Sequence, residues 1–504
     1  MIRVDEERER SLMLYTSTRQ KLDNITATKA ILQGISNEGG LFVPTNMPKM
    51  DFTIEELANW SYQEVAYRVM GLFFDEIKDE DLKYCIEHAY DDKFDTKEIA
   101  PLVHTKTGNF LELFHGPTIA FKDMALSILP YLMLTSKRYN GEEKDIVILT
   151  ATSGDTGKAA LEGFANVEGT KIIVFFPQDG VSDVQKQQMV TTEGDNTFVV
   201  GVKGNFDDCQ TTVKEIFGDK EFAKELADKN YKFSSANSIN IGRLIPQVAY
   251  YFAAYGKMVR DGKLKAGETM NVVVPTGNFG NILASYYAKQ MGLPIGKMIC
   301  ASNSNKVLFD FFTSGTYDRN RAFFLTASPS MDILISSNLE RLLYHISGES
   351  TETVNDLMAS LKTEGKYTIT DTMRENIKDF YGGYADDETT KAYIKKVFDE
   401  EGYLMDTHTA VAYAVYDKYI KETKDDTPTV IVSTASPYKF THSVMTAVDE
   451  KYDGISDFEL LDHMQKLIEG DMPKAMDHIA TRKINHNTVC KVDEMKNMVS
   501  KFLV

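Results

Sequence analysis

The sequence has few cysteines and no long apolar run. Its 504 residues include only four cysteines, which are far apart and form neither a CxxC motif nor a Cys/His ligand spacing: Cys85, Cys209, Cys300 and Cys490. This pattern excludes a disulfide framework and a structural zinc site, so we expect no metal and a reducing compartment. The charged N-terminus and the absence of an apolar run of about 18 residues predict neither secretion nor a membrane span. We therefore expect a cytoplasmic protein without a membrane partner.

Basic residues are fewer than acidic ones. Lysine and arginine together number 56 against 74 acidic residues, which gives a formal net charge of -18. Such a balance disfavours nucleic acid as a partner, and an anionic ligand would need a local positive site. The length and the 43% hydrophobic content predict two or three domains with sizeable cores.

The pattern along the chain predicts an α/β protein. β-branched runs at 145–151, 171–177, 196–204 and 270–277 alternate with helical patterns, which indicates βαβ units and parallel sheets flanked by helices. Another apolar strand is expected from residue 429. We expect a mainly helical N-terminal domain at 1–95, a smaller α/β domain at 96–265 and a larger one at 266–504. A helical insertion at about 305–425, where strand signals almost vanish, interrupts the last of these.

One lysine is out of place in the segment FHGPTIAFKDMALSI, residues 114–128. Lys122 follows an apolar run and precedes an apolar helix start. Burying an unpaired ammonium costs several kcal/mol, so this lysine is either exposed, paired or neutral. Only a neutral amine would be a nucleophile. The nearby His115 is either a proton carrier or a hydrogen-bonded structural residue.

Two strand-to-helix turns could bind anions. In the first, Gly277, Asn278, Phe279, Gly280 and Asn281 place backbone N–H groups at a helix N-terminus, where the helix dipole attracts a phosphate. An ordinary tight turn is the alternative.

The second turn reads TATSGDTGK. Thr152, Ser153, Asp155 and Thr156 add side-chain groups for a carboxylate or phosphate, although simple helix capping explains the same residues. Lys158 does not complete a P-loop, because Thr152 stands where that motif needs glycine.

A third loop carries hydroxyl and amide side chains ahead of an arginine. Asn237 and Ser238 offer neutral donors, and Arg243 offers a two-pronged guanidinium for a phosphate or carboxylate. A capping cluster with a surface arginine is the alternative. A carbonyl cofactor such as pyridoxal phosphate would need both the lysine and one phosphate loop, and the further loops would imply a second anionic ligand. No GxSxG, HExxH or dinucleotide GxGxxG motif competes with this interpretation.

The string ELFHGPTIAFKD resembles the cofactor-lysine motif of the threonine synthase family, pyridoxal-phosphate enzymes of fold type II, the tryptophan-synthase-β-like fold. The resemblance extends along nearly the whole chain, and the insertion is similar to that of the longer form found in bacteria and fungi. Further matching segments are YTSTR, NEGGLFVP, ATSGDTGKAA, DDCQTTVKEIFGD, NSINIGR, PTGNFGNILA, SPSMDILISSNLERLL, DTHTAVA and STASPYKF.

This resemblance implies a role for each candidate residue. Lys122 would hold the cofactor as a Schiff base, the 277–281 loop would bind its phosphate, and Thr434 would face its pyridine nitrogen. The 152–156 turn would receive the substrate carboxylate, and the loop ending in Arg243 would bind the substrate phosphate. The implied reaction converts O-phospho-L-homoserine and water to L-threonine and phosphate in a monomer or homodimer.

Three other interpretations remain. A serine or threonine dehydratase, or a phosphate-releasing lyase that yields 2-oxobutyrate, would share the fold, but a hydroxyl substrate needs no phosphate site. A non-catalytic binding protein would have no need for an intact lysine, phosphate loop and Thr434. An unrelated α/β protein would require all these motifs to be ordinary capped turns.

Overall fold

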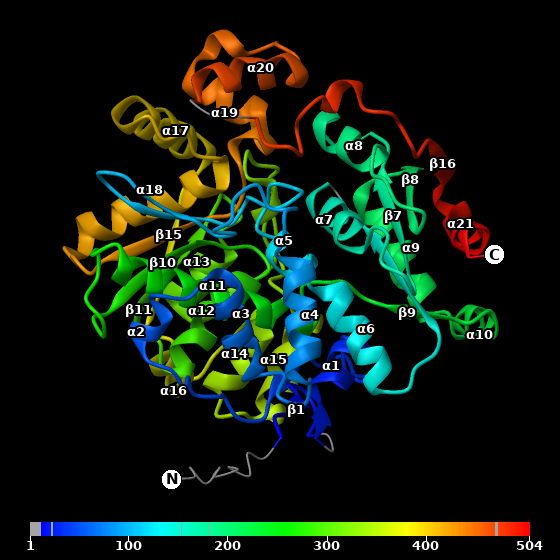
Figure 1. The fold of residues 1–504 in the computed structure, drawn as a ribbon. Coiled ribbons are helices and arrows are strands. Elements are labelled where there is room, and N and C mark those ends of the chain that lie inside the picture. The colour runs from blue at the N-terminus through cyan, green and yellow to red at the C-terminus, as the bar shows by residue number, and fades with distance from the viewer. Residues whose placement is uncertain (1–11, 22–23, 153, 180, 469–471, 504) are drawn as a thin grey trace, which may run out of the picture.

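The computed structural model describes residues 12–21, 24–152, 154–179, 181–468 and 472–503. Two mixed α/β regions lie side by side in it, with the N-terminal helices packed against both (Figure 1). In the part of the chain that the structure describes, no helix is both long and apolar enough to cross a membrane.

The N-terminal part combines a small antiparallel sheet with four helices. Helices α2 and α3 each begin with a capping box, in which Thr53 pairs with Glu56 and Ser61 with Glu64. Helices dominate here as expected, but the sheet was not predicted. The elements are β1 (Leu14–Ser17), β2 (Ile25–Thr26), α1 (Ala27–Gln33), β3 (Phe42–Pro44), α2 (Ile54–Leu57), α3 (Tyr62–Gly71) and α4 (Asp79–Ala89).

A six-stranded sheet forms the larger α/β region. All its neighbouring strands are parallel except β4 and β5. Its order is β14 (Phe380–Tyr384), β11 (Ile295–Ser302), β10 (Met270–Pro275), β15 (Thr429–Ser433), β5 (Asn109–Glu112) and β4 (Leu102–His104).

Both faces of this sheet are buried, so its strands are apolar at successive positions rather than at alternate ones. Val272 and Val274 of β10 face the core that contains α11 (Ile241–Arg260) and α12 (Gly280–Met291). Val273 faces the opposite core, which contains α18 (Thr407–Thr423) and α19 (Thr441–Val448). Helix α11 is buried at every position from Ile241 to Met258, which makes it the central helix of the molecule.

A five-stranded, fully parallel sheet forms the smaller region. Ile146 and Ile148 of β6 join the core that also holds α11, whereas Val147 and Leu149 face a separate core. One continuous core therefore links the two sheets. The strand order is β16 (Thr488–Lys491), β8 (Thr197–Lys203), β7 (Thr170–Pro177), β6 (Asp145–Ala151) and β9 (Tyr231–Ser234).

The other helices cover these sheets or lie in the segment after β11. Those near the first sheet strands and the smaller sheet are α5 (Asp123–Leu126), α6 (Leu129–Tyr139), α7 (Asp155–Phe164), α8 (Asp183–Val190), α9 (Phe206–Gly218), α10 (Lys220–Asp228) and α21 (Met495–Phe502). Those after β11 are α13 (Val307–Ser314), α14 (Leu339–Ile346), α15 (Thr351–Thr363), α16 (Asp371–Asn376), α17 (Asp387–Glu401) and α20 (Asp457–Leu467).

The strand pairing departs from the expected domain boundaries in two places. Strands β4 and β5 precede the smaller sheet in the chain but belong to the larger one, and β16 near the C-terminus pairs with β8 of the smaller sheet. Figure 1 shows β16 and α21 beside β8, away from α19 and α20. The boundaries at residues 95 and 265 therefore do not separate the two sheets, since each sheet recruits a strand from a distant segment.

The expected helical insertion at about 305–425 also needs correction. It contains the short antiparallel pair β12 (Thr316–Asp318) and β13 (Lys366–Thr368), as well as β14, an edge strand of the larger sheet. Strand β14 reads FYGGY, and its two glycines weaken any local strand signal. It forms because β11 pairs with it along its whole length.

We predict that the C-terminal segment stabilises the smaller region. Met495 is fully buried in the core beneath β7 and β8. Met495→Ala should lower the free energy of unfolding by about 2–5 kcal/mol, since it removes buried methylene groups and leaves a cavity. Urea unfolding followed by circular dichroism measures this effect. Val489→Ala is the control, because Val489 is exposed on β16, and equal midpoints for the two variants would contradict the prediction.

Candidate active site

Lys122 lies at the start of α5, in a loop that is fixed to the end of β15. The backbone N–H of Phe121 donates to the carbonyl of Thr434 at 2.8 Å, and the N–H of Ser436 donates to the carbonyl of Ile119 at 3.0 Å. Thr434 is buried where β15 ends. The structure thus brings together the lysine and the threonine that the sequence predicted, although they are far apart in the chain.

The residues around Lys122 hold this loop in one shape. The hydroxyl of Thr118 donates to Asp123 at 2.6 Å, and its backbone N–H donates to the other carboxylate oxygen at 2.8 Å. Burial raises the pKa of Asp123 to about 6, although both bonds favour its ionised form. Gly116 is required because a Cβ there would lie 2.6 Å from an oxygen of Asp123. The HGPT and FKD parts of the motif are therefore one interlocked turn.

The amine of Lys122 is buried and faces a carboxylate. Its Nζ lies 3.3 Å from Oδ2 of Asp155, at the start of α7. Burial lowers the pKa of Lys122, and the positive charges of Lys439 and Arg243 lower it further, while Asp155 opposes them. Of the three states that its sequence context allows, Lys122 therefore occupies the paired one, and its pKa is lowered by burial.

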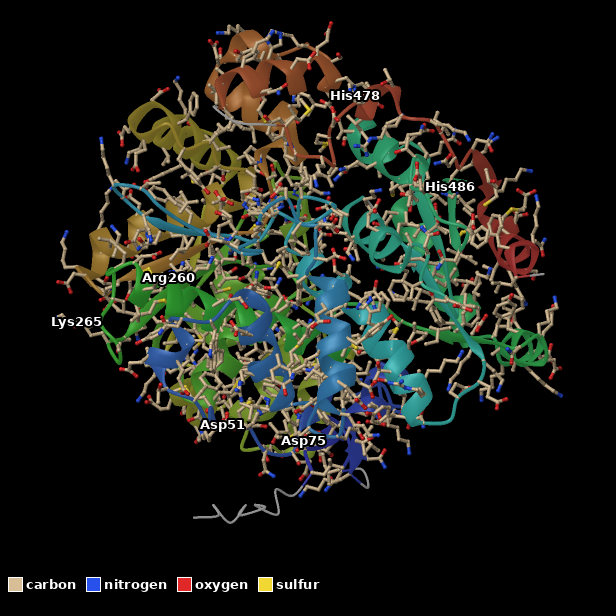
Figure 2. All side chains as sticks on the ribbon, in the orientation of Figure 1. Asp51, Asp75, Arg260, Lys265, His478 and His486 are labelled. Atoms are coloured by element: carbon tan, nitrogen blue, oxygen red, sulfur yellow. The ribbon has the colours of Figure 1, made fainter. Side chains whose placement is uncertain are left out.

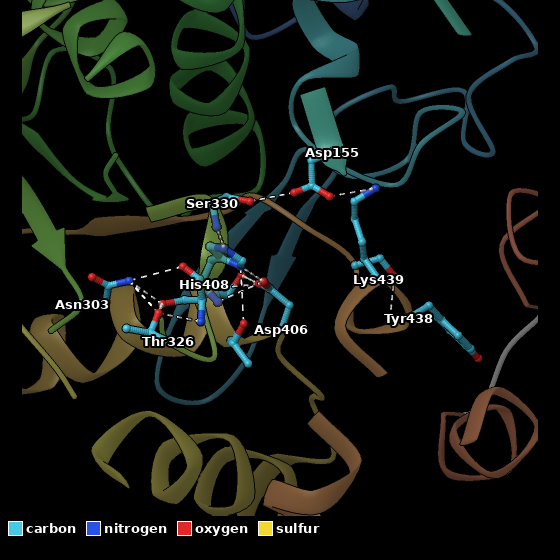
Figure 3. Close-up of polar contacts among 12 residues, drawn as sticks. Asp155, Asn303, Thr326, Ser330, Asp406, His408, Tyr438 and Lys439 are labelled. Atoms are coloured by element: carbon cyan, nitrogen blue, oxygen red, sulfur yellow. Dashed lines mark hydrogen bonds and ion pairs between the residues drawn. The ribbon is translucent and has the colours of Figure 1, made fainter. Parts of the chain in front are cut away.

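Asp155 receives donors on both carboxylate oxygens. Ser330 Oγ donates to Oδ2 at 2.7 Å, Gln185 Nε2 donates to Oδ1 at 3.0 Å, and Lys439 Nζ lies 3.4 Å from Oδ1. Figure 3 shows Asp155 between Ser330 and Lys439. Although burial alone would raise it, Lys122 and Lys439 hold the pKa of Asp155 well below its usual range. The two lysines therefore favour the ionised form of Asp155.

Ser330 is positioned by a buried histidine. Its backbone N–H donates to Nε2 of His408 at 3.1 Å, and Nδ1 of His408 lies 2.7 Å from Asp406 (Figure 3). The aspartate fixes the orientation of the imidazole, as carboxylates do for histidines in many sites. The segment that carries Ser330 is thereby fixed to the start of α18.

The other residues of the second turn differ in burial and in hydrogen bonding. The hydroxyl of Thr152 accepts the backbone N–H groups of Gly154 and Gly157, both at 3.0 Å, so it caps the turn as the alternative interpretation proposed. Thr156 is half-buried in the first turn of α7. Ser153 lies outside the described residues. Substrate binding by this turn stays a prediction.

The glycine loop between β10 and α12 forms a tight concave turn. A Cβ on Gly277 would lie 2.8 Å from the carbonyl of Ser330, so the close approach of these segments requires glycine. Phe279 has a left-handed backbone with φ of 67° and packs its buried ring near Phe312 and Phe380. The side chain of Phe279 therefore anchors the loop, and the backbone N–H groups are the donors that an anion could contact.

Asn281 presents its side chain at this helix N-terminus. Tyr250 and Tyr251 of α11 donate to its Oδ1 at 2.8 and 2.5 Å, whereas its buried Nδ2 has no hydrogen-bond partner among the residues that the structure describes. The two tyrosines fix the amide so that a free donor remains.

The third loop leads into a buried arginine, Arg243. Arg243 is 4% exposed and donates through Nη1 to the carbonyl of Ala236 at 2.9 Å, while its Nε has no partner. No carboxylate of the described residues forms an ion pair with it, and burial lowers its pKa to about 10. The alternative of a surface arginine is wrong. Asn237 is exposed, and Ser238 Oγ donates to it at 3.2 Å.

Asn338, the N-cap of α14, and Arg341 within that helix join the third loop to the glycine loop. Asn338 Nδ2 donates to the carbonyls of Ser238 at 3.3 Å and Asn278 at 3.1 Å. The fully buried Arg341 donates to Asn338 Oδ1, to the carbonyl of Ile239 at 2.6 Å and to that of Phe42 at 2.9 Å. The two loops are therefore held as one unit.

The unpartnered donors fit a phosphorylated cofactor and a second anion. Asn281 Nδ2 lies at the helix N-terminus that would receive the first phosphate, and Arg243 Nε lies on the neighbouring helix. A buried donor without an acceptor is costly, and an anion removes this cost. Among the described residues no cluster of three or more His, Cys, Asp or Glu side chains could hold a metal ion.

His115 belongs to a separate ion cluster. Its Nδ1 lies 2.6 Å from Asp95 and its Nε2 lies 2.9 Å from Glu112, which also accepts from the hydroxyl of Tyr403 at 2.8 Å. Although burial opposes it, the two carboxylates raise the pKa of His115 to about 9. The structural interpretation of this histidine is favoured over a proton carrier.

Comparison with known proteins identifies the family. Models described as threonine synthase N terminus, pyridoxal-phosphate dependent enzyme and threonine synthase C-terminal match residues 14–90, 111–435 and 409–489. Threonine synthase of Saccharomyces cerevisiae is 38% identical over 466 residues, 86% of this chain and 89% of the relative. The chain belongs to the threonine synthase family. Threonine synthase of Pseudomonas aeruginosa is also 38% identical, over 86% of this chain and 90% of the relative.

Solved structures of this family share the fold. The yeast threonine synthase crystal structure matches with a TM-score of 0.87 and 36% identity, covering 97% of this chain and 98% of the other. A pyridoxal-phosphate-bound threonine synthase from Brucella melitensis matches over the same shares with a TM-score of 0.85 and 36% identity. The predicted resemblance, the type II fold and the cofactor class are confirmed.

Sequence reasoning missed several residues of the site. Ser330, Asn338 and Arg341 lie in a segment that was quoted for its resemblance, but it was assigned only to a helical insertion and no site residue was named in it. Lys439 lies in STASPYKF, which was quoted for Thr434 alone. Lys439 is preceded by Pro437 and Tyr438 and followed by Phe440, and no long apolar run leads up to it as one leads up to Lys122.

We predict that Arg243 makes the protein responsive to inorganic phosphate. With cofactor saturating, phosphate at ten times its dissociation constant should stabilise the protein by about 1.4 kcal/mol. Arg243→Met should abolish most of this effect, since the guanidinium is the only unpaired buried cation described in the three loops. Thermal unfolding with and without phosphate measures it.

The matched control for this test is Arg260→Met. Arg260 lies at the other end of α11, near the edge of the molecule (Figure 2), and is 46% exposed. Its loss should leave the phosphate response unchanged. An equal response in both variants and the parent protein would contradict the role of Arg243.

A second prediction concerns pH and His115. Its folded pKa of about 9 lies above the ordinary 6.5, so its stabilisation is fully present below 6.5 and is lost as pH rises through 9. His115→Asn should therefore lower stability by about 2 kcal/mol at pH 6 and by much less at pH 10. Urea unfolding at both pH values tests this, with the exposed His478→Asn as control. A pH-independent difference would contradict it.

Proposed function

We propose that this chain is a threonine synthase that converts O-phospho-L-homoserine and water to L-threonine and phosphate. Its membership of the family supports this assignment. The observation that carries it in this chain is the unpaired, buried guanidinium of Arg243 on the helix next to the cofactor-phosphate loop. A substrate that brings a phosphate of its own accounts for this second anion-binding group.

The cofactor would be held by residues from three segments. Lys122 would bond to its carbonyl carbon, the backbone N–H groups of 278–281 and Asn281 Nδ2 would bind its phosphate, and Thr434 would face its ring nitrogen. When bound, pyridoxal phosphate withdraws electrons from the attached amino acid and makes its α-proton acidic. A threonine at the ring nitrogen supplies no full negative charge, so the surrounding protein must stabilise developing charge elsewhere.

Lys122 would move the protons of the reaction. Its lowered pKa favours a neutral amine that can accept the proton from the substrate α-carbon, return that proton to the bound cofactor and substrate, and then, neutral again, accept one from the β-carbon. Asp155, ionised and held by four donors, would keep the amine in place between these transfers.

Arg243, Asn237 and Ser238 would bind the phosphate before and after it leaves the γ-carbon. A phosphate that remains on Arg243 could position the water that adds at the β-carbon, because its oxygens accept hydrogen bonds beside the reacting carbons. The half-buried Thr156 and the second turn would receive the substrate carboxylate.

The test combines a spectrum with product analysis. The purified protein with cofactor should show a visible absorbance band, and O-phospho-L-homoserine should yield threonine and phosphate in equal amounts. Lys122→Ala should lose the band and reduce turnover by at least about 1,000-fold, because one residue both bonds the cofactor and moves protons. The control is Lys257→Met, because Lys257 is a buried lysine of α11 that pairs with Glu98. This variant should retain both the absorbance band and the turnover.

The products separate this function from its rivals. Phosphate released with 2-oxobutyrate in place of threonine would indicate a lyase. A band without turnover would indicate a binding protein. Turnover by Lys122→Ala would refute the proposed mechanism.

A further inference from the structure

Lys439 is a second buried lysine at the site. It lies in the short 3-10 turn Pro437–Phe440 that follows β15, and its side chain is 0% exposed. Its Nζ donates to the carbonyl of Thr118 at 2.9 Å and lies 3.4 Å from Oδ1 of Asp155. Lys439 thereby links the lysine loop, the end of β15 and the start of α7, three segments that are far apart in the sequence.

Lys439 and Lys122 share one carboxylate. Lys122 approaches Oδ2 of Asp155 at 3.3 Å, and Lys439 approaches Oδ1 from the other side. The charged groups that face Lys122 are Asp155, Lys439 and Arg243. Lys439 in turn acts on Asp155, Asp123 and Lys158.

This arrangement places opposing charges around the amine of Lys122. Asp155 alone would stabilise an ammonium at Lys122, and an ammonium has no lone pair with which to attack a carbonyl. A fixed cation on the far side of Asp155 offsets the carboxylate and repels a proton from Lys122. Because Lys439 is also bonded to Thr118, it keeps Asp155 at a fixed distance from the loop that carries Lys122.

We propose that Lys439 is a positioning residue of the active site, a fixed buried cation that holds Asp155 and keeps the Lys122 amine available to the cofactor. This inference rests on the proposed function, because it assigns Lys439 a role through Lys122. Nothing in it requires Lys439 to touch the substrate.

The test measures Lys122 directly. The full-length protein, freed of cofactor, is pulsed with acetic anhydride at a series of pH values, and acetylation of Lys122 is quantified by mass spectrometry. In Lys439→Met the pH midpoint for acetylation should rise by about one pH unit, since a like charge a few Å away has been removed. Lys439→Arg, which keeps the charge, should remain near the parent midpoint, and so should the control Lys257→Met.

Two results would overturn the proposal. The first is an unchanged midpoint in folded Lys439→Met. The second is an equal rise in Lys439→Arg and Lys439→Met, which would indicate that only the shape of the lysine matters. Folding is verified by circular dichroism and by the acetylation of exposed lysines.

If Lys439→Met does not fold, Asp155→Asn and the double variant Asp155→Asn/Lys439→Met replace it. The double variant leaves no unpaired carboxylate next to an apolar methionine. The Lys122 midpoint should then be higher in the double variant than in Asp155→Asn, because Lys439 repels the Lys122 ammonium directly. Equal midpoints would overturn the proposal.

A readout on the cofactor-loaded enzyme separates this inference from the proposed function. The acid limb of the turnover profile should move upward in Lys439→Met by a similar amount, and Lys439→Arg should restore it. If the enzyme makes another product, the turnover assay reveals that while the acetylation midpoints still test Lys439.

Discussion

The burial of one carboxylate between two lysines is the interaction on which the site depends. Asp155 would be costly to bury alone, and so would either Lys122 or Lys439. Together with Ser330 and Gln185, the lysines satisfy both carboxylate oxygens. Because each member comes from a different segment, the charges can only be balanced when the lysine loop, α7 and the turn after β15 have all reached their final positions.

The two sheets are arranged so that these segments meet. The end of β15 bonds to the lysine loop, and α7 follows β6 of the smaller sheet, so the ion cluster bridges the two regions. One continuous core, which contains α11, packs against both sheets and so supports the ion cluster. The same helix supplies Arg243 and the tyrosines that orient Asn281. A shift of α11 would therefore displace both anion-binding groups together.

The parts that sequence could predict are those whose signal is local. Strands β6, β10 and β15 lie between helical layers, and burial on both faces gives them continuous β-branched runs. Strands β14 and β16 lie at sheet edges and are short, glycine-rich or flanked by charge, so pairing rather than composition creates them. The same contrast holds in the site. Lys122 interrupts an apolar run and was found, whereas Asn338 and Arg341 lie in a charged helix whose burial depends on the loops it joins.

The unpaired donors are the physical basis of the substrate selectivity that we propose. Among the described residues, Lys122 and Lys439 have a carboxylate partner, Arg243 has none, and Asn281 keeps one amide donor free. Burying a cation without a counter-ion costs free energy, and an anionic ligand bound to Arg243 would remove this cost. A neutral hydroxyl substrate would leave the Arg243 guanidinium without a counter-ion, whereas a phosphorylated substrate would supply one. The proposed discrimination between these substrates would thus follow from an ion pair that Arg243 can complete only with a ligand.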